Sequence, residues 1–256
     1  MSAMTISGSG NDIFKSYSQL ASGKRINSAA DDAAGLAIAK KMQREETGLS
    51  VGAQNAQAGI GALNVADGAL GGMTDYLQRI RDLALRSMNG LNTAEDKQIY
   101  QDEINQLKQG IQSLAKDTSL NEQKLLDGSM ADMGIATNPN GGGMKIQMEN
   151  STLEALGIAD LDVTSDKFDL KAIDKALDMV SSRRSSIGAA TNRLEHTYNY
   201  NTRASLEQLG ARSRLEDLDF PKAISEKQQK EVLGQYRMMM LRQQMNQKSM
   251  ITGMFF

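Results

Sequence analysis

A heptad repeat of small and apolar residues constrains the fold of this chain more than any other feature. Between residues 49 and 84 these side chains recur at intervals of three or four, with one extra three-residue step. Such spacing is typical of a long helix that packs side by side with other helices. We therefore expect one long helix from about Asp31 to Asn89. The repeat comprises Leu49, Ala53, Ala56, Ile60, Leu63, Ala66, Leu70, Met73, Leu77, Ile80 and Ala84.

The same segment is rich in glycine, which weakens a helix. Each glycine costs a helix interior about 0.5–1 kcal/mol relative to alanine. We therefore expect tertiary contacts to hold this helix, and small residues suit a partner whose backbone comes close. The glycines are Gly48, Gly52, Gly59, Gly61, Gly68, Gly71 and Gly72.

Two further helices are predicted to pack against the first. Asn89-Gly90 is a helix end, and Thr93 with Asp96 resembles a capping box that opens the next helix. So short a link predicts an antiparallel pair. The stripe of this second helix is Tyr100, Ile104, Leu107, Ile111 and Leu114. The third helix, predicted over 169–212, has a stripe of Leu170, Ile173, Leu177, Val180, Ile187, Leu194 and Tyr198, with Arg184 and Thr191 as polar interruptions.

The segment between the second and third helices has a different character. Residues 138–143 read Asn-Pro-Asn-Gly-Gly-Gly, which indicates a loop, and MKIQM follows with the alternation of a strand. We expect a small β-hairpin region near 129–166. The predicted fold class is therefore mainly α: an elongated antiparallel helical bundle or coiled-coil rod over 31–212, with this hairpin region and terminal helices.

The two ends of the chain carry weaker patterns. Residues 1–30 include a short helical stripe of Ile13, Phe14, Tyr17 and Leu20 that stops at Ser22-Gly23. Pro221 marks the start of a last helix within 213–256. Such a helix is marginal alone and needs a partner surface, so we expect both ends to be disordered in the monomer. The last helix has a weak stripe of Val232, Tyr236, Met239 and Met240 and finishes in Phe255 and Phe256.

Composition offers little chemistry. The chain has 29 basic and 31 acidic residues, so no general field draws it to nucleic acid or to a membrane. There is no cysteine, and His196 is the single histidine, which excludes Cys–His nucleophilic sites and ordinary zinc sites. Asp31 and Asp32 lack further ligands at useful spacing, and helix capping explains them better than a metal. We expect no cofactor and no enzyme activity. The opening lacks a basic start and an apolar run, so no Sec-type signal peptide is expected.

Several motifs in the same order resemble bacterial flagellin. SGKRINSAADDAAGLAIAKKM, NAQAGIGALNVADGAL, LQRIRDLALRSMNG, QDEINQLKQGI and NEQKLLDG resemble its N-terminal half, and NRLEHTYN and ARSRLEDLD its C-terminal half. The resemblance covers about residues 20–128 and 170–220. It implies a rod of long helices, with the terminal segments 1–30 and 213–256 forming the inner tube of a filament. The final segment departs from the family's Ala- and Gln-rich ending.

The resemblance also implies partners. The chain would self-assemble into the extracellular flagellar filament, with an export chaperone and hook-associated proteins as partners. An innate immune Toll-like receptor would contact the surface of Gln78, Arg79, Leu83 and Glu103, and this surface would pack against the next subunit in the filament. Because Arg79 and Leu83 lie off the heptad repeat, we expect both to point outward. The alternatives are a hook–filament junction protein, which DDAAGLAI disfavours, and a helical binding module that does not assemble.

Overall fold

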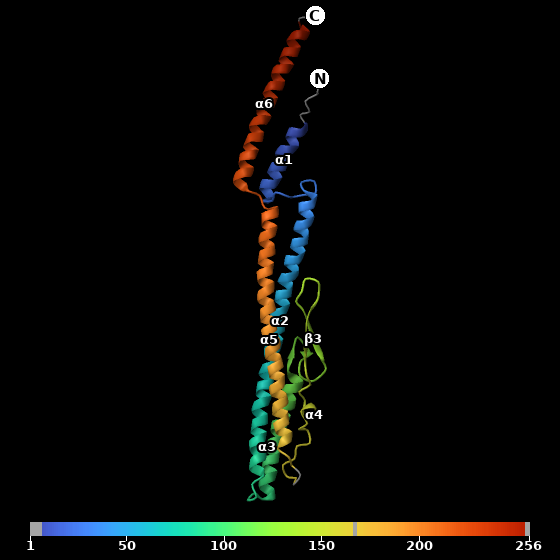
Figure 1. The fold of residues 1–256 in the computed structure, drawn as a ribbon, viewed down its shortest axis with the longest axis vertical. Helices are drawn as coiled ribbons and strands as arrows, with labels where there is room; N and C mark the ends of the chain where they lie inside the picture. Colours follow the sequence, from blue (N-terminus) through green and yellow to red (C-terminus); the bar gives the residue numbers. More distant parts are fainter. Residues whose placement is uncertain (1–6, 166–167, 254–256) are drawn as a thin grey trace. The chain divides into compact units, whose positions relative to one another are not determined.

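The computed structural model describes residues 7–165 and 168–253, and the chain divides into two compact units. Unit 1 comprises Met1–Glu46 and Leu206–Phe256, and unit 2 is Thr47–Ser205. Helices dominate the described residues (Figure 1). They are α1 (Ser7–Ser22), α2 (Ala33–Ser87), α3 (Ala94–Asp117), α4 (Leu153–Leu156), α5 (Lys171–Glu216) and α6 (Phe220–Gly253). The mainly α fold class predicted from the sequence is confirmed.

The heptad repeat is the buried stripe of α2. Every one of its eleven residues, from Leu49 to Ala84, is buried. In unit 2, α5 runs antiparallel beside α2 (Figure 1). Two ion pairs show this order: Arg81 binds Asp174 at 2.7 Å, and Asp67, earlier on α2, binds Arg184, later on α5, at 2.9 Å. A seam of small and apolar residues therefore holds this pair of helices, as the sequence predicted.

The helix α3 returns along α2, again as predicted. Its start is a capping box, in which the Asp96 backbone N–H donates to the Thr93 hydroxyl and the Thr93 backbone N–H donates to the Asp96 carboxylate. Ile104 and Ile111 are buried in the core between the helices. Gly110 lies against the ring of Tyr76 on α2, and an added Cβ there would come within 2.9 Å of that ring.

The buried stripe of α5 differs in part from the predicted one. Ile173, Val180, Ile187 and Leu194 are buried as expected. Of the two adjacent arginines, Arg183 is buried, whereas Arg184 is exposed and pairs with Asp67. Tyr198 is exposed rather than buried. The other buried positions are Ala176, Arg183 and Ala190, three residues after Ile173, Val180 and Ile187. The predicted stripe had placed them four residues after, at Leu177, Arg184 and Thr191.

The expected hairpin is present. β3 (Asp132–Ala136) pairs antiparallel with β4 (Gly143–Gln147), with Met133 opposite Ile146 and Ile135 opposite Met144. A second antiparallel pair, β1 (Ser119–Leu120) with β2 (Gln123–Lys124), is not predicted by the sequence analysis. Its two central residues, Asn121 and Glu122, have φ of 50° and 66°, the backbone of a type I′ turn.

The loop of the hairpin β3–β4 is seated on the long helices. On α2, the Asn55 amide donates to the Ala136 carbonyl at 2.8 Å, and on α5 the Asn201 amide donates to the Thr137 carbonyl at 2.7 Å. Thr137 also lies so close to Gly52 that an added Cβ would come within 2.2 Å of its carbonyl oxygen. Position 52 therefore requires glycine, because the backbone of the hairpin loop comes close to α2 there. This agrees with the expectation that small residues of α2 face a partner's backbone.

Unit 1 brings the two ends of the chain together. α1 and α6 lie side by side, with the Tyr17 hydroxyl donating to Glu231 at 3.2 Å and the Lys227 ammonium 4.1 Å from the centre of the Tyr17 ring (Figure 1). α1 and α6 are therefore partners within one chain, whereas the expectation that both ends are disordered in the monomer assumed that they lack such a partner. The physical reason is that these contacts are polar and cation–π contacts, which an apolar stripe does not reveal.

Within unit 1, the residues that follow α1 pair with the residues at the end of α5. Lys24 and Asp217 form an antiparallel bridge, and the Arg25 backbone N–H donates to the Glu216 carbonyl at 2.6 Å. The Lys24 ammonium also pairs with the buried Glu216 carboxylate at 3.2 Å. Gly23 has φ of 69°, which supports its predicted place at the end of α1. Pro221 lies in the first turn of α6, also as predicted.

The paired aspartates before α2 have different partners: Asp32 caps the helix, and Asp31 stabilises the turn that precedes it. The Asp32 carboxylate accepts the Gly35 backbone N–H at 2.8 Å. The Asp31 carboxylate binds the Lys15 ammonium at 2.7 Å and accepts the backbone N–H groups of Asn27 and Ser28. These partners, Lys15 first, lower the pKa of Asp31 to about 2. The capping interpretation is confirmed for Asp32, whereas Asp31 binds Lys15 and the turn before the helix.

Candidate assembly surfaces

The first candidate surface lies where α2 and α3 run side by side in unit 2. The Arg79 guanidinium binds one Glu103 carboxylate oxygen through both Nε, at 2.9 Å, and Nη2, at 2.6 Å. Both side chains are nearly half exposed, and Gln78 beside them is exposed as well. The structure therefore brings together three of the four residues named for this surface.

Leu83 does not belong to this exposed surface. Its exposed fraction is 2%, and it is part of the hydrophobic core of unit 2, so the prediction that it points outward is wrong. The reason is that α2 packs against both α3 and α5, and two neighbouring helices cover a wider face than the heptad repeat marks. Gly72 and Tyr76 contact α3, and Leu83 follows Tyr76 by two helical turns on the same side. The buried face of α2 is therefore wider than the heptad repeat.

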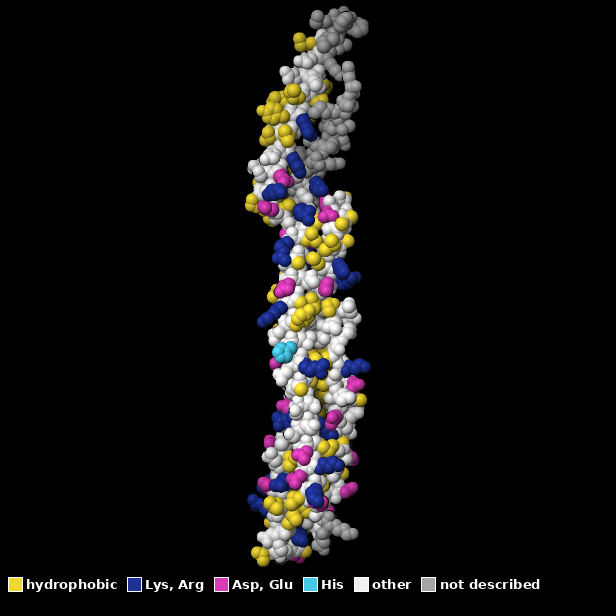
Figure 2. Space-filling view, viewed as in Figure 1, with side chains coloured by type: hydrophobic (Ala, Val, Ile, Leu, Met, Phe, Trp, Pro, Cys, Tyr) yellow, Lys and Arg dark blue, Asp and Glu magenta, His cyan; other side chains and the backbone are white. Residues whose placement is uncertain are grey.

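The second candidate surface is a stripe on α6. Val232, Tyr236, Met239 and Met240 are all exposed. Their spacing places them on one face of the helix, at intervals of three and four residues. Figure 2 shows hydrophobic side chains gathered on the surface of this helix. We call these four residues the α6 stripe. Phe255 and Phe256, also named for inner-tube packing, lie outside the described residues.

The opposite face of α6 has a partner within the chain. Lys227 and Glu231 contact Tyr17 of α1, and the Lys230 ammonium donates to the Ser16 hydroxyl at 3.3 Å. Lys227 precedes Tyr236 by nine residues, or two and a half turns, so the two side chains leave opposite sides of the helix. α1 therefore covers one side of α6 and leaves the α6 stripe uncovered.

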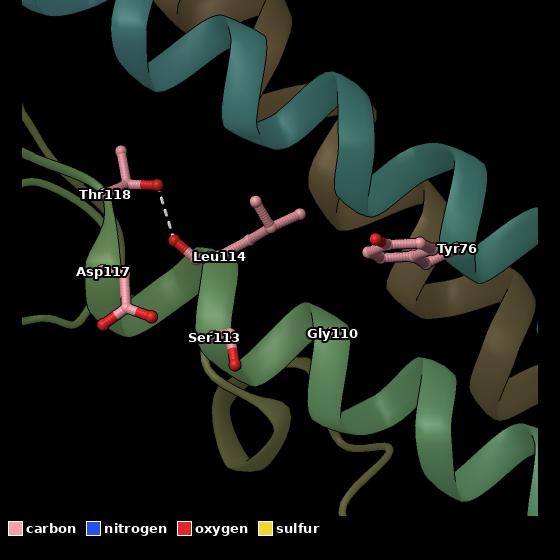
Figure 3. Close-up of a pocket in the computed structure, with 6 residues that line it drawn as sticks. All are labelled: Tyr76, Gly110, Ser113, Leu114, Asp117 and Thr118. Atoms are coloured by element: carbon pink, nitrogen blue, oxygen red, sulfur yellow. Dashed lines mark hydrogen bonds between the residues drawn. The ribbon is translucent and has the colours of Figure 1, made fainter.

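A shallow hollow of about 390 Å³ lies between α2 and α3 (Figure 3). It is lined by Tyr76, Gly110, Ser113, Leu114, Asp117 and Thr118. The Thr118 hydroxyl donates to the Leu114 carbonyl, so this hydroxyl is engaged in closing the end of α3. Asp117 is the single carboxylate among the lining residues. This lining offers packing between two helices rather than a pair of acid and base groups.

Within residues 7–165 and 168–253, no group of three or more His, Cys, Asp or Glu side chains could hold a metal ion. No helix in the same ranges is long and apolar enough to cross a membrane.

Comparison with known proteins decides what these surfaces belong to. Residues 2–131 match the family model of the bacterial flagellin N-terminal helical region, and residues 170–253 match that of the C-terminal helical region. The chain belongs to the bacterial flagellin family. The second match includes all of α6, although this helix departs from the family's Ala- and Gln-rich ending. The family is structural rather than enzymatic, and this flagellin is a structural subunit of the flagellar filament.

Individual flagellins agree with this assignment. The chain is 37% identical to a flagellin of Halalkalibacterium halodurans over 236 residues, which cover 90% of this chain and 86% of the relative. It is 38% identical to a flagellin of Bacillus subtilis over 269 residues, which cover 90% and 88%. The crystal structure of Bacillus cereus flagellin superposes with a TM-score of 0.53 at 27% identity, covering 58% of this chain and 88% of that one.

Proposed function

We propose that this flagellin is exported without a Sec signal peptide and assembles outside the cell. The terminal segments 1–30 and 213–256 pack as the inner tube of the filament, and residues 31–212 form the rod layer around it. The observation that carries this proposal is the α6 stripe. α1 covers the opposite side of α6, so the stripe lies on a side of this helix that a neighbouring copy can cover.

The energetics favour burial of the α6 stripe in a polymer. Fully burying a large apolar side chain contributes about 1.5–3 kcal/mol relative to exposure. Four such side chains on one helix therefore supply a strong driving force once neighbouring copies cover them. A contact between two different surfaces of identical subunits generates an open helical array when the rotation does not close. A filament satisfies this requirement.

The polar surface of Gln78, Arg79 and Glu103 serves a second contact in the proposal. It packs against the next subunit in the filament, and in the free subunit it is the contact for an innate immune Toll-like receptor. Because Leu83 is buried, we assign it to the hydrophobic core beneath this surface rather than to the contact itself. An exposed ion pair contributes about 0–1 kcal/mol, so this pair is dispensable for the fold.

The two remaining proposed partners are an export chaperone and the hook-associated proteins. We propose that residues 222–256 bind the export chaperone as an amphipathic segment before assembly, through the α6 stripe. Hook-associated proteins contact the assembled filament at its ends. Deletion of residues 222–256 should abolish chaperone binding in a pull-down with the full chain as the reference.

A charge placed on the α6 stripe tests the assembly proposal. Tyr236→Asp should abolish filaments seen by electron microscopy, because a carboxylate would be buried between copies. Met245→Asp is the matched control, since it introduces the same carboxylate at an exposed position on the opposite side of α6 and should still give filaments. Circular dichroism should show equal helix content in both variants. Filaments from Tyr236→Asp as abundant as those of the unmodified chain would contradict the proposal.

The polar surface has a separate test. Arg79→Ala should weaken filaments and receptor binding while the melting temperature of the monomer changes little. The exchange Arg79→Glu with Glu103→Arg keeps the ion pair within the subunit and should still weaken both contacts. A large drop in monomer stability for Arg79→Ala would show that this side chain acts inside the subunit instead.

A further inference from the structure

We propose that Met239 and Met240 are an oxidation site through which peroxides block filament growth. This inference rests on the proposed packing of the α6 stripe between copies. In the free subunit both thioethers are accessible to the oxidant. In the filament neighbouring copies cover them, so the site responds before assembly and is protected afterwards.

Exposure separates these methionines from others in the chain. The exposed fractions are 66% for Met239 and 59% for Met240, against 0% for Met73 and 5% for Met148 in the core of unit 2. Oxidation of methionine requires access of the oxidant to the sulfur. The two stripe methionines should therefore react far faster than the two core methionines.

Position on the helix separates them from equally exposed neighbours. Met238 and Met245 have exposed fractions of 53% and 67%. They follow Tyr236 by two and nine residues, which places both on roughly the opposite side of α6. That is the side from which Lys227 contacts α1. Met239 and Met240 follow Tyr236 by three and four residues, which keeps them on the α6 stripe.

The chemistry is a two-electron oxidation of a thioether. A sulfur lone pair attacks one oxygen of hydrogen peroxide, the O–O bond breaks, and a sulfur–oxygen bond forms. The sulfur is oxidised to the sulfoxide and the peroxide is reduced to water, with its two hydrogens carried away in that water. Methionine sulfoxide reductases reverse the change, one enzyme for each sulfoxide epimer.

The sulfoxide changes what the α6 stripe can do. It converts a flexible apolar side chain into a polar one with a strong acceptor oxygen. Burying that oxygen between apolar side chains without a donor is unfavourable. With two such groups on one contact, we expect the critical concentration for assembly to rise at least roughly tenfold.

The experiment treats the purified full chain with dilute hydrogen peroxide. Peptide mass spectrometry measures the sulfoxide fraction at each methionine, and sedimentation with electron microscopy measures the critical concentration before and after treatment. We expect sulfoxide at residues 239 and 240, little at Met73 and Met148, and the loss of assembly. Treatment with both sulfoxide reductases should restore it.

Paired leucine variants locate the effect. Met239→Leu with Met240→Leu keeps the stripe apolar and removes both thioethers, so its assembly should withstand peroxide. Met238→Leu with Met245→Leu is the matched control and should stay sensitive. If treated wild type assembles normally with both sulfoxides present, the inference is refuted. If the untreated chain forms no filament, the proposed function itself fails, and the inference with it.

Discussion

Replacement of Gly52 by alanine should destabilise the subunit, although alanine is the better helix former. The added Cβ would come within 2.2 Å of the Thr137 carbonyl oxygen and within 2.9 Å of the Asn201 amide nitrogen. Neither neighbour can yield easily, because Thr137 and Asn201 are both buried and are joined by a 2.7 Å hydrogen bond. The loop of the hairpin β3–β4 must therefore lift from α2.

The magnitude follows from two opposing effects. Overpacking of this kind costs about 1–3 kcal/mol, and a buried amide left without its acceptor adds about 1–3 kcal/mol if the loop moves away. Alanine returns about 0.5–1 kcal/mol through its helix propensity. We therefore expect a net loss of about 1–5 kcal/mol, measured by urea unfolding of the monomer followed by far-ultraviolet circular dichroism.

Two other glycines of α2 provide the control. Gly61 and Gly68 have nothing within 4 Å of an added Cβ, so alanine there should stabilise the monomer by about 0.5–1 kcal/mol. The sign of the effect thus depends on what the glycine faces, not on its place in a helix. If Gly52→Ala raised stability as Gly61→Ala does, the close approach of the hairpin loop to α2 would be refuted.

Three further changes test other parts of the fold by unfolding of the monomer. Glu122→Gly should raise stability by about 0.5 kcal/mol, since glycine adopts φ of 66° without strain; a loss would contradict the turn geometry. Leu83→Ala should lower stability by about 2–4 kcal/mol, whereas a neutral result would return Leu83 to the surface. Asp31 has a lowered pKa, so it stabilises the fold above its ordinary pKa and loses this effect as pH falls toward about 2. Lys15→Ala should raise the pKa of Asp31, as a nuclear magnetic resonance titration would show, and an unchanged pKa would exclude the ion pair as its cause.

The long helices could be predicted because their signals are local and repeated. The heptad repeat of α2 identifies its buried face from Leu49 to Ala84, and the capping box at Thr93 marks the start of α3. The loop and strand pattern after residue 138 likewise predicts the hairpin β3–β4. In each case residues close together in the sequence both form the pattern and determine the local structure.

The sequence analysis failed where a residue's environment depends on a second partner. Leu83 lies off the heptad repeat and is still buried, because α3 widens the covered face of α2. On α5, Arg183 takes the buried place expected for Arg184, since its guanidinium reaches Glu149 and Ser151 outside the bundle of long helices. One residue separates these two positions on a helix, and periodicity alone cannot choose between them.

Of the two surfaces of α6, the sequence predicted one and missed the other. The sequence pattern identified the α6 stripe, and the structure leaves it exposed, because nothing in unit 1 covers that side of the helix among the described residues. It missed the contact of Tyr17 with Glu231 and Lys227, which determines the side of α6 that is left uncovered. The signal for that contact was an aromatic residue on α1 and opposite charges four residues apart on α6.

The most direct test of the central claim is an electron cryo-microscopy reconstruction of filaments grown from the purified chain. The account predicts a helical filament in which neighbouring copies bury Val232, Tyr236, Met239 and Met240, while α1 stays against the opposite side of α6. A filament with these four side chains facing solvent, or a chain that forms no filament under any assembly condition, would contradict it.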